Sequence, residues 1–398
     1  MSRLEELIQQ YCHDGVEYNN LGEVLGVNRG RRLTKMQLSD DGQYYVYHGS
    51  KDTPLGKYSQ FNVKGNTTIV VNTGGIGGVK FCDDDFWCSD GSFWIGHSDL
   101  FNDKFVYYYL SPLEPYFASQ KRVGGVPTID RSVVENVEIP VPPLPVQEEI
   151  VRILDNFAEL QAELQAELQK RLQQYNYYRD NLLSFEGRTD VEWKKLGDVF
   201  DTTTDFTAAG SFADIAANVV YNRNKDYALL VRTTDIKSNF TKEDKVYISQ
   251  SAFEYLWRVR LDKSSIILPN IGANCGEVHF IKPENLPMQN CALGPNALLL
   301  RTEHYENRFY YHYFNITTFQ KELRKIISPG GQTKFNKTEL RKISIPVPTI
   351  AEQQKIVDIL DRFDALTTDI TAGLPAEIEA RRKQYEYYRD KLLTFKKK

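Results

Sequence analysis

The sequence has no long apolar run and few cysteines or histidines, and these absences exclude several classes of protein. No stretch approaches the about 18 apolar residues that a membrane-spanning helix needs. The first ten residues, MSRLEELIQQ, have neither the apolar core nor the small-residue cleavage site of a signal peptide. The five cysteines are scattered without a CxxC pair, which favours reduced thiols in a cytoplasmic protein over a zinc site or a disulfide framework.

A surplus of basic charge is also missing. The 398 residues carry a formal net charge of −4. We count 13 Lys and Arg against 18 Asp and Glu in residues 1–138, and 21 against 18 in residues 190–344. The chain therefore has no general basic coat for nucleic acid, which leaves DNA binding to local basic surfaces.

The sequence lacks a complete catalytic motif as well. The nearest glycine-rich loop, NTGGIGGVK at 72–80, does not have the spacing or the Lys-Ser/Thr ending of a phosphate-binding P-loop. We expect a tight hairpin there, with a DNA phosphate contact through Lys80 as the alternative. DVEWK at 190–194 resembles a fragment of a metal nuclease, but the matching GVEYN at 15–19 lacks its Asp and Lys. With six dispersed histidines, neither a catalytic residue nor a metal ligand is expected.

An internal repeat is the most informative feature that the sequence does contain. IPVPPLPVQEEIVRILDNFAEL (139–160) matches IPVPTIAEQQKIVDILDRFDAL (345–366) without a gap. QYNYYRDNLLSF (174–185) likewise matches QYEYYRDKLLTF (384–395). The second copy is longer by four residues between these two anchors, so the internal two-fold is imperfect.

The remaining segments repeat more weakly. FNDKFVYYYL (101–110) parallels YENRFYYHYF (305–314), and VEYNNLGEV (16–24) parallels VEWKKLGDV (191–199). The chain therefore reads globule, helix, globule, helix, with diverged globules and nearly identical helical parts. In a duplication, this contrast indicates that the helices keep one shared role while the globules have two different ones.

The pattern of each copy predicts its structure. Short β-branched and aromatic runs, broken by Gly, Asn and Pro, predict sheet with some helix in the globules. Each globule ends in a proline-spaced extended stretch, at 139–145 and 345–348, and a helix is expected after the last proline. Apolar residues spaced by three and four predict amphipathic helical regions of about 40–50 residues. Gly373-Leu374-Pro375 interrupts the second region, and two such regions pack most simply as an antiparallel pair.

The start of the chain resembles the end of a helical region. Leu4, Leu7 and Ile8 precede the first globule much as Leu182 and Leu183 precede the second. The sequence therefore predicts that the two chain ends lie together in a closed, pseudo-two-fold molecule.

Two variable globules that alternate with two repeated helical regions resemble the specificity subunit of a type I DNA restriction–modification system (HsdS). The resemblance covers the whole chain, and its most specific parts are IPVPPLPVQEEIVRILD, IPVPTIAEQQKIVDILD, YYRDNLLSF and YYRDKLLTF. It implies an α+β fold with two α/β target recognition domains, separated by two long antiparallel, coiled-coil-like helical regions. The expected boundaries are 1–138 for the first recognition domain with a short N-terminal helix, 139–189 for the junction and central helical region, 190–344 for the second recognition domain, and 345–398 for the junction and C-terminal helical region.

The resemblance also implies partners. Each globule would read one half of a split double-stranded DNA target, while the helices set the spacer and dock two adenine-methyltransferase (modification) subunits. Restriction subunits, which carry nuclease and translocase activity, would join that complex. The chain itself would be non-catalytic and would bind no cofactor, because S-adenosylmethionine, ATP and Mg²⁺ belong to the partner subunits. No membrane partner is expected. The alternative is a coiled-coil adaptor whose globules bind proteins.

Candidate site residues follow from residue type. Phosphates are bound by Lys and Arg, and base edges by Arg, Lys, Asn and Gln. The DNA-binding candidates, each of which could also be an ordinary solvated side chain, are Arg29, Arg31, Arg32, Lys35, Lys80, Lys121, Arg122, Arg223, Lys225, Arg232, Thr233, Gln332, Lys334 and Lys337. The repeated tails give the candidate subunit interface: Tyr177, Tyr178, Leu182, Phe185, Tyr387, Tyr388, Leu392 and Phe395. Base stacking is an alternative role for the tyrosine pairs, but packing at a helix or subunit interface is expected.

The tetrad AELQ occurs three times in succession at 158–169. One interpretation is a favourable helix extended by replication slippage. The other is a ruler, because the family resemblance implies tetrad repeats whose copy number follows spacer length. Four residues lengthen a helix by about 6 Å and turn it by a net of about 40°. One DNA base pair advances about 3.4 Å and turns about 34–36°, so the rotations agree better than the translations.

Overall fold

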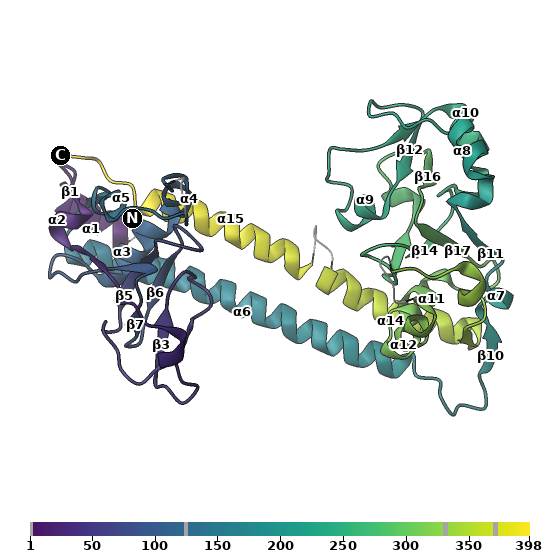
Figure 1. The fold of residues 1–398 in the computed structure, drawn as a ribbon, viewed down its shortest axis with the longest axis horizontal. Helices are drawn as coiled ribbons and strands as arrows, with labels where there is room; N and C mark the ends of the chain where they lie inside the picture. Colours follow the sequence, from purple (N-terminus) through teal and green to yellow (C-terminus); the bar gives the residue numbers. More distant parts are fainter. Residues whose placement is uncertain (1–2, 123–125, 329–332, 369–372) are drawn as a thin grey trace. The chain divides into compact units, whose positions relative to one another are not determined.

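The computed structural model describes residues 3–122, 126–328, 333–368 and 373–398 (Figure 1). These form two compact units, residues 1–166 with 376–398 and residues 167–375. Each unit therefore contains one globule and a part of each helical region. No described helix combines the length and the apolar character that crossing a membrane requires.

The first globule is built from short strands and helices. Its strands are β1 (Tyr18–Asn20), β2 (Val27–Arg29), β3 (Tyr44–Tyr47), β4 (Gly56–Tyr58), β5 (Thr67–Val71), β6 (Val79–Cys82), β7 (Trp87–Cys88), β8 (Ser92–Ile95) and β9 (Glu138–Pro140). Its helices are α1 (Arg3–Tyr11), α2 (Leu21–Val24), α3 (Asp103–Leu110), α4 (Glu114–Ser119) and α5 (Arg131–Glu135).

The second globule has the same kinds of element. Its strands are β10 (Glu192–Lys195), β11 (Thr202–Asp205), β12 (Ala228–Val231), β13 (Tyr247–Ile248), β14 (Ser265–Pro269), β15 (His279–Ile281), β16 (Cys291–Leu293), β17 (Ala297–Arg301) and β18 (Ser344–Val347). Its helices are α7 (Leu196–Val199), α8 (Phe212–Asn218), α9 (Thr233–Lys237), α10 (Gln250–Tyr255), α11 (Asn307–Phe314), α12 (Thr317–Ile326) and α13 (Lys337–Leu340).

The two globules share one sheet topology despite their sequence divergence. The four-stranded sheet has the order β2-β8-β5-β6 in the first globule and β11-β17-β14-β15 in the second. The three-stranded sheet has the order β4-β3-β7 and β13-β12-β16, with one parallel pair in each, β3–β7 and β12–β16. A two-stranded sheet, β1–β9 or β10–β18, joins the start of each globule to its end. The internal duplication predicted from the sequence is therefore confirmed.

Long helices follow each globule. α6 (Leu144–Leu182) continues over 39 residues and contributes to both units, whereas α14 (Ile350–Thr368) belongs to the second unit and α15 (Leu374–Leu392) almost wholly to the first. Within each unit two helical segments lie side by side and antiparallel: α6 with α15, and α6 with α14 (Figure 1).

The predicted start of the first helix is wrong by two residues. The extended stretch expected at 139–145 ends earlier, because α6 begins at Leu144 and has Pro145 in its first turn. α15 begins in the same way, at Leu374 before Pro375. A proline at this position loses no hydrogen bond, since the first N–H groups of a helix have no intrahelical partner.

In each unit one hydrophobic cluster is shared by the globule and the long helices. In the first unit, Ile150 and Leu154 of α6 lie in one cluster with Phe105 and Phe117 of the globule. In the second unit, Leu360 of α14 lies in the corresponding cluster with the globule. Burial of this apolar surface, at about 25 cal/mol per Å², fixes each helical segment to its own globule.

The two ends of the chain lie together in the first unit (Figure 1). Val16 N–H donates to the Lys396 carbonyl at 2.8 Å, and Lys398 N–H donates to the Val16 carbonyl at 3.0 Å. Leu4 of α1 packs in the same apolar cluster as Leu393. The prediction that the N-terminal segment meets the C-terminal tail is confirmed.

Candidate nucleic-acid interface

A buried glutamine joins each helix to its globule. The Gln147 side chain on the first turn of α6 accepts from Asn102 N–H at 2.8 Å and donates to the Leu100 carbonyl at 2.8 Å. Gln353 on α14 accepts in the same way from Glu306 N–H at 3.0 Å. Both side chains are fully buried. Sequence reasoning did not single them out, although the gapless match between the copies aligns them.

Aromatic stacks repeat along the helices. Phe157 stacks on Tyr388 in the first unit, with ring centroids 5.7 Å apart and planes inclined by 23°. Phe363 stacks on Tyr178 in the second unit at 5.7 Å and 28°. The four residues are equivalent pairs in the repeat, so both units use one packing arrangement. Such pairs stabilise by about 0.5–1.5 kcal/mol beyond their area burial.

The candidate subunit-interface residues divide into two groups. Tyr177 and Tyr387 are 67% and 63% exposed, and each meets the edge of its neighbouring tyrosine at 5.6 Å or 5.4 Å. Tyr178 and Tyr388 are exposed beside them. The other four candidates pack inward against the cores of their own units: Leu182, Phe185, Leu392 and Phe395. The outward-facing part of the predicted interface therefore consists of two equivalent tyrosine pairs.

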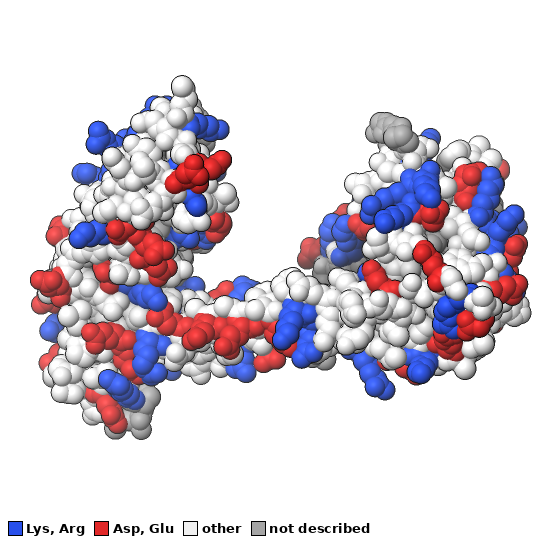
Figure 2. Space-filling model, turned by 90° about the horizontal axis from the view of Figure 1, so that it is seen from below, with Lys and Arg blue, Asp and Glu red and all other residues white. Residues whose placement is uncertain are grey.

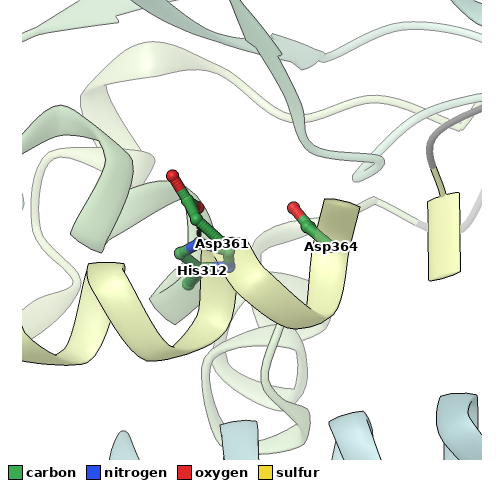
Figure 3. A group of neighbouring side chains, drawn as sticks. All are labelled: His312, Asp361 and Asp364. Atoms are coloured by element: carbon green, nitrogen blue, oxygen red, sulfur yellow. Dashed lines mark hydrogen bonds and ion pairs between the residues drawn. The ribbon is translucent and has the colours of Figure 1, made fainter. Parts of the chain in front are cut away.

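A histidine–aspartate group lies where the second globule meets α14. His312 on α11 and Asp361 and Asp364 on α14 have potential ligand atoms within 4.8 Å of one another (Figure 3). Arg308 binds both carboxylates, through Nε to Asp361 at 2.7 Å and through a terminal nitrogen to Asp364 at 2.6 Å. Since one guanidinium binds both carboxylates, the group is an internal ion network between α11 and α14.

His312 is fully buried in this network. Its Nε2 lies 2.8 Å from Asp361 and its Nδ1 lies 3.3 Å from the Tyr175 hydroxyl. Burial lowers the pKa of His312, against the hydrogen bond to Asp361, which raises it. For Asp361, burial raises the pKa, but hydrogen bonds from His312 and Arg308 outweigh it and leave the pKa below its ordinary value. The imidazole is therefore neutral at neutral pH and donates through Nε2 to an ionised carboxylate.

The first unit keeps the carboxylate but not the histidine. Asp155 of α6 accepts from Lys104 at 3.0 Å and from the Tyr108 hydroxyl at 2.6 Å. In the repeat these residues align with Asp361, Arg308 and His312. Ala158 stands where the second copy has Asp364. The contact between helix and globule therefore occurs at equivalent positions of the two copies, but it is made by different side chains.

The DNA-binding candidates are mostly exposed. Those that are exposed and have no ion-pair partner among the described residues are Arg29, Arg31, Arg32, Lys35, Lys121, Lys225 and Lys334. Lys80 is half-buried, with Nζ 5.3 Å from the ring centre of Tyr47, and Thr233 is also half-buried. Gln332 lies outside the described residues. On the face drawn in Figure 2, basic and acidic side chains are intermingled on each unit.

Some candidates are held by carboxylates. Arg122 pairs with Asp130, Lys337 with Asp205 at 3.2 Å, and Arg223 with Asp244 at 4.0 Å. Arg232 is the most constrained, because its guanidinium lies 2.7 Å from an oxygen of the buried Asp235 and 2.6 Å from the Asp244 carbonyl. Arg232 has fewer free donors for DNA than the exposed cations, and its role stays a prediction.

The structure brings two loops together in each globule. A β-bridge joins Thr73, in the glycine-rich hairpin, to Thr128, which also bridges Arg122. In the second globule Ile271 bridges Lys334. Ser328 also bridges Lys334. Lys334 therefore corresponds to Thr128 and Ser328 to Arg122, so the two basic candidates lie in the same loop pairing but at different positions of it.

The glycine-rich stretch 72–80 is a hairpin between β5 and β6, as predicted. Its turn depends on glycine, since Gly77 has a φ of +85°. A Cβ there would lie 2.8 Å from the Ala118 nitrogen. This close backbone approach explains the glycines without any phosphate, and a contact of Lys80 with DNA stays a prediction.

Comparison with known proteins agrees with this duplicated architecture. The family model of the type I restriction modification DNA specificity domain matches residues 13–174 and again residues 189–380. A Haemophilus influenzae protein, named as a type I restriction enzyme specificity subunit, is 30% identical over 96% of both chains. The specificity subunit of the Escherichia coli EcoR124I/EcoR124II type I restriction enzyme is 36% identical over 74% of this chain and 71% of that protein.

Solved structures share the fold. The S subunit of a type I restriction–modification system from M. genitalium superposes with a TM-score of 0.56 at 17% identity, over 95% of each chain. A chain from a structure of the assembly and conformational transition of a type I system gives 0.55 at 17% identity, over 95% of this chain and 97% of that one. The two matched domains, the two relatives and the shared fold agree. The chain belongs to the family of specificity subunits of type I restriction–modification systems.

Proposed function

We propose that this chain is the non-catalytic DNA-reading subunit of a type I complex, in which each globule reads one half of a bipartite target. The observation that carries the proposal is the contrast between repeated joints and diverged globules. The glutamine joints and the Phe–Tyr stacks recur in both units with nearly equal distances. The globules keep their sheet order but differ in net charge and in the residues around Asp155 and Asp361.

A non-catalytic role fits the chemistry of the described residues. The His312–Asp361–Asp364 group is occupied by Arg308, and its histidine is fully buried. A general base or metal site needs an accessible position for substrate or water. The group instead supports the joint between α11 and α14, so methylation and cleavage belong to partner subunits in this proposal.

The repeated tyrosine pairs support docking of two modification subunits. Tyr177 with Tyr178, and Tyr387 with Tyr388, present the same edge-to-face pair at equivalent places of the two copies. Exposed tyrosines are typical of protein interfaces, where they supply apolar area and a hydroxyl. Two equivalent surfaces fit two copies of one partner better than two unrelated partners.

The AELQ repeat supports a role of α6 in setting the spacer. The first unit ends at Ala166 and the second begins at Glu167, so the boundary lies inside the third AELQ tetrad. α6 is continuous through this boundary. A tetrad changes the helix by a net rotation of about 40°, close to the about 34–36° of one base pair. In this proposal the number of tetrads sets the number of unspecified base pairs between the half-sites.

Binding to DNA distinguishes this proposal from the protein-adaptor alternative. The chain would be assembled with its modification subunits and titrated with duplexes of random sequence. We expect saturable binding of a subset of sequences, with an affinity that falls steeply with salt because phosphate contacts release counterions. Binding that does not depend on sequence, or no binding at any salt concentration, would favour an adaptor whose globules contact proteins.

A further inference from the structure

The second unit contains an open cleft with an apolar lining. Its volume is about 550 Å³. Phe206, Ile215, Val219 and Ala297 contribute the apolar floor, and Phe212 and Tyr221 lie at the rim. None of these side chains belongs to the helix joints described above.

Large apolar groups are exposed at the rim of the cleft and beside it. Phe212 is 84% exposed, and Val220 and Tyr221 are more than half exposed. Phe212 is the first residue of α8, whose start is fixed by Ser211: its hydroxyl accepts from Asp214 N–H at 3.2 Å. An exposed phenyl ring on a capped helix end is costly in water, and such apolar surface is typical of a binding site.

Cationic residues lie next to residues that line the same cleft, although the charged residue in the lining itself is Asp205. The segment that begins at Tyr221 continues to Arg223 and Lys225, both exposed. On another side, Ile271 lines the cleft and is bridged to Lys334. Lys337 pairs with Asp205, which also lines the cleft. An apolar floor with cations beside it is complementary to DNA, whose phosphates are anionic while its bases offer apolar contacts.

From this juxtaposition we infer that the cleft binds the 5-methyl group of a thymine in the half-site read by the second globule. This methyl is the apolar group that base pairs present in the major groove. Phe212 and Tyr221 would contact the methyl, while Arg223, Lys225 and Lys334 would bind the neighbouring phosphates. The inference rests on the proposed function and adds a specificity-determining site to it.

Replacing thymine by uracil tests this inference, because uracil lacks only the methyl group. The complex with modification subunits would bind duplexes in which each thymine of the second half-site is replaced singly. We expect uracil at one or two positions to weaken binding about fourfold, as for removal of one buried methylene-sized group. Phe212→Ala should weaken binding to the natural duplex and remove this dependence on uracil, whereas Phe212→Leu should retain part of it.

Trp257→Ala is the matched control, because Trp257 is 59% exposed in the same unit and does not line the cleft. It should leave both affinity and the uracil pattern unchanged. Tolerance of uracil at every position, or a second half-site without thymine, would overturn the inference while the proposed function stands. Loss of assembly with modification subunits in Phe212→Ala without DNA would overturn it in favour of a protein partner. Absence of sequence-dependent binding by the native complex would overturn the proposed function and this inference together.

Discussion

His312 is a buried neutral histidine, so its protonation opposes folding. Burial keeps its folded pKa below the ordinary value of 6.5. The unfolded chain therefore binds more protons than the folded chain once the pH falls below about 6.5, and stability decreases with falling pH in that range. The pKa of His279 is lowered by burial too and adds to the same trend.

We therefore expect His312→Gln to reduce the loss of unfolding free energy between pH 7 and pH 5.5, without abolishing it. Urea titrations at both pH values, followed by circular dichroism, would measure this difference. His13→Gln is the control for loss of a histidine at a largely exposed position. An unchanged pH dependence in His312→Gln would contradict a neutral, buried imidazole.

Gln147 and Gln353 give a second prediction for single residues. Gln147→Leu removes the partners of Asn102 N–H and the Leu100 carbonyl, and leaving such buried groups unpaired costs about 1–3 kcal/mol. Gln353→Leu should lower the unfolding free energy by a similar amount, because it leaves Glu306 N–H unpaired. Denaturant titrations would measure both. Gln165→Leu, at an exposed position of α6, is the matched control, and an equal loss in the control would contradict the specific role of the joints.

The sequence predicts some of these residues better than others. Alignment of the two copies pairs Gln147 with Gln353 and Asp155 with Asp361, so identity across the repeat was a usable signal. The cationic DNA-binding candidates are not identified by comparing the copies. Whether the N–H groups of a Lys or Arg are free to bind DNA depends on the side chains that pack beside it in the folded protein. Arg232 illustrates this: its partner Asp235 is buried three residues along the chain, which residue type alone does not reveal.

In the long helices, some side chains pack inside a unit and stabilise it, while others face outward and are available to bind another subunit. Phe157 and Phe363 are half-buried in the stacks, whereas Tyr177 and Tyr387 point outward. We expect Tyr177→Ala with Tyr387→Ala to weaken assembly with two modification subunits while thermal stability is retained. Phe157→Ala with Phe363→Ala should instead lower thermal stability, because it removes both stacks.

Analytical ultracentrifugation of the mixed subunits, together with thermal unfolding, would measure both effects. Each single tyrosine variant should weaken the binding of one modification subunit and leave the other bound. Assembly of the double tyrosine variant at full affinity would show that the tails do not form the subunit interface.

The AELQ tetrads allow a prediction about the length of α6. Deleting residues 162–165 removes one tetrad and should keep both half-sites, while the spacer between them shortens by about one base pair. Deleting residues 162–163 instead removes a rotation of about 200° and should abolish methylation at any spacing. Mapping methylated sites would measure both. An unchanged spacer with full activity after the four-residue deletion would show that the repeat is only a favourable helix.

At the scale of the whole molecule, the internal repeat predicted more of the architecture than the local sequence patterns did. Matching two copies predicted the order of globules and helices and the meeting of the chain ends. The strand order that the two globules share could not be predicted from the sequence, because the globules have few identical residues outside their junctions. The cleft at Phe212 was not predictable either, since it forms where α8, the strand that begins at Ala297 and the turn at Asn270 meet.

An exchange of globules tests the central claim most directly. Residues 190–344 would be replaced by the matching globule of a relative with a different target, and methylated sites would be mapped in complex with the modification subunits. The account predicts that one half of the target changes while the other half and the spacer stay the same. If both halves change, or neither does, the claim that each globule reads one half-site is contradicted.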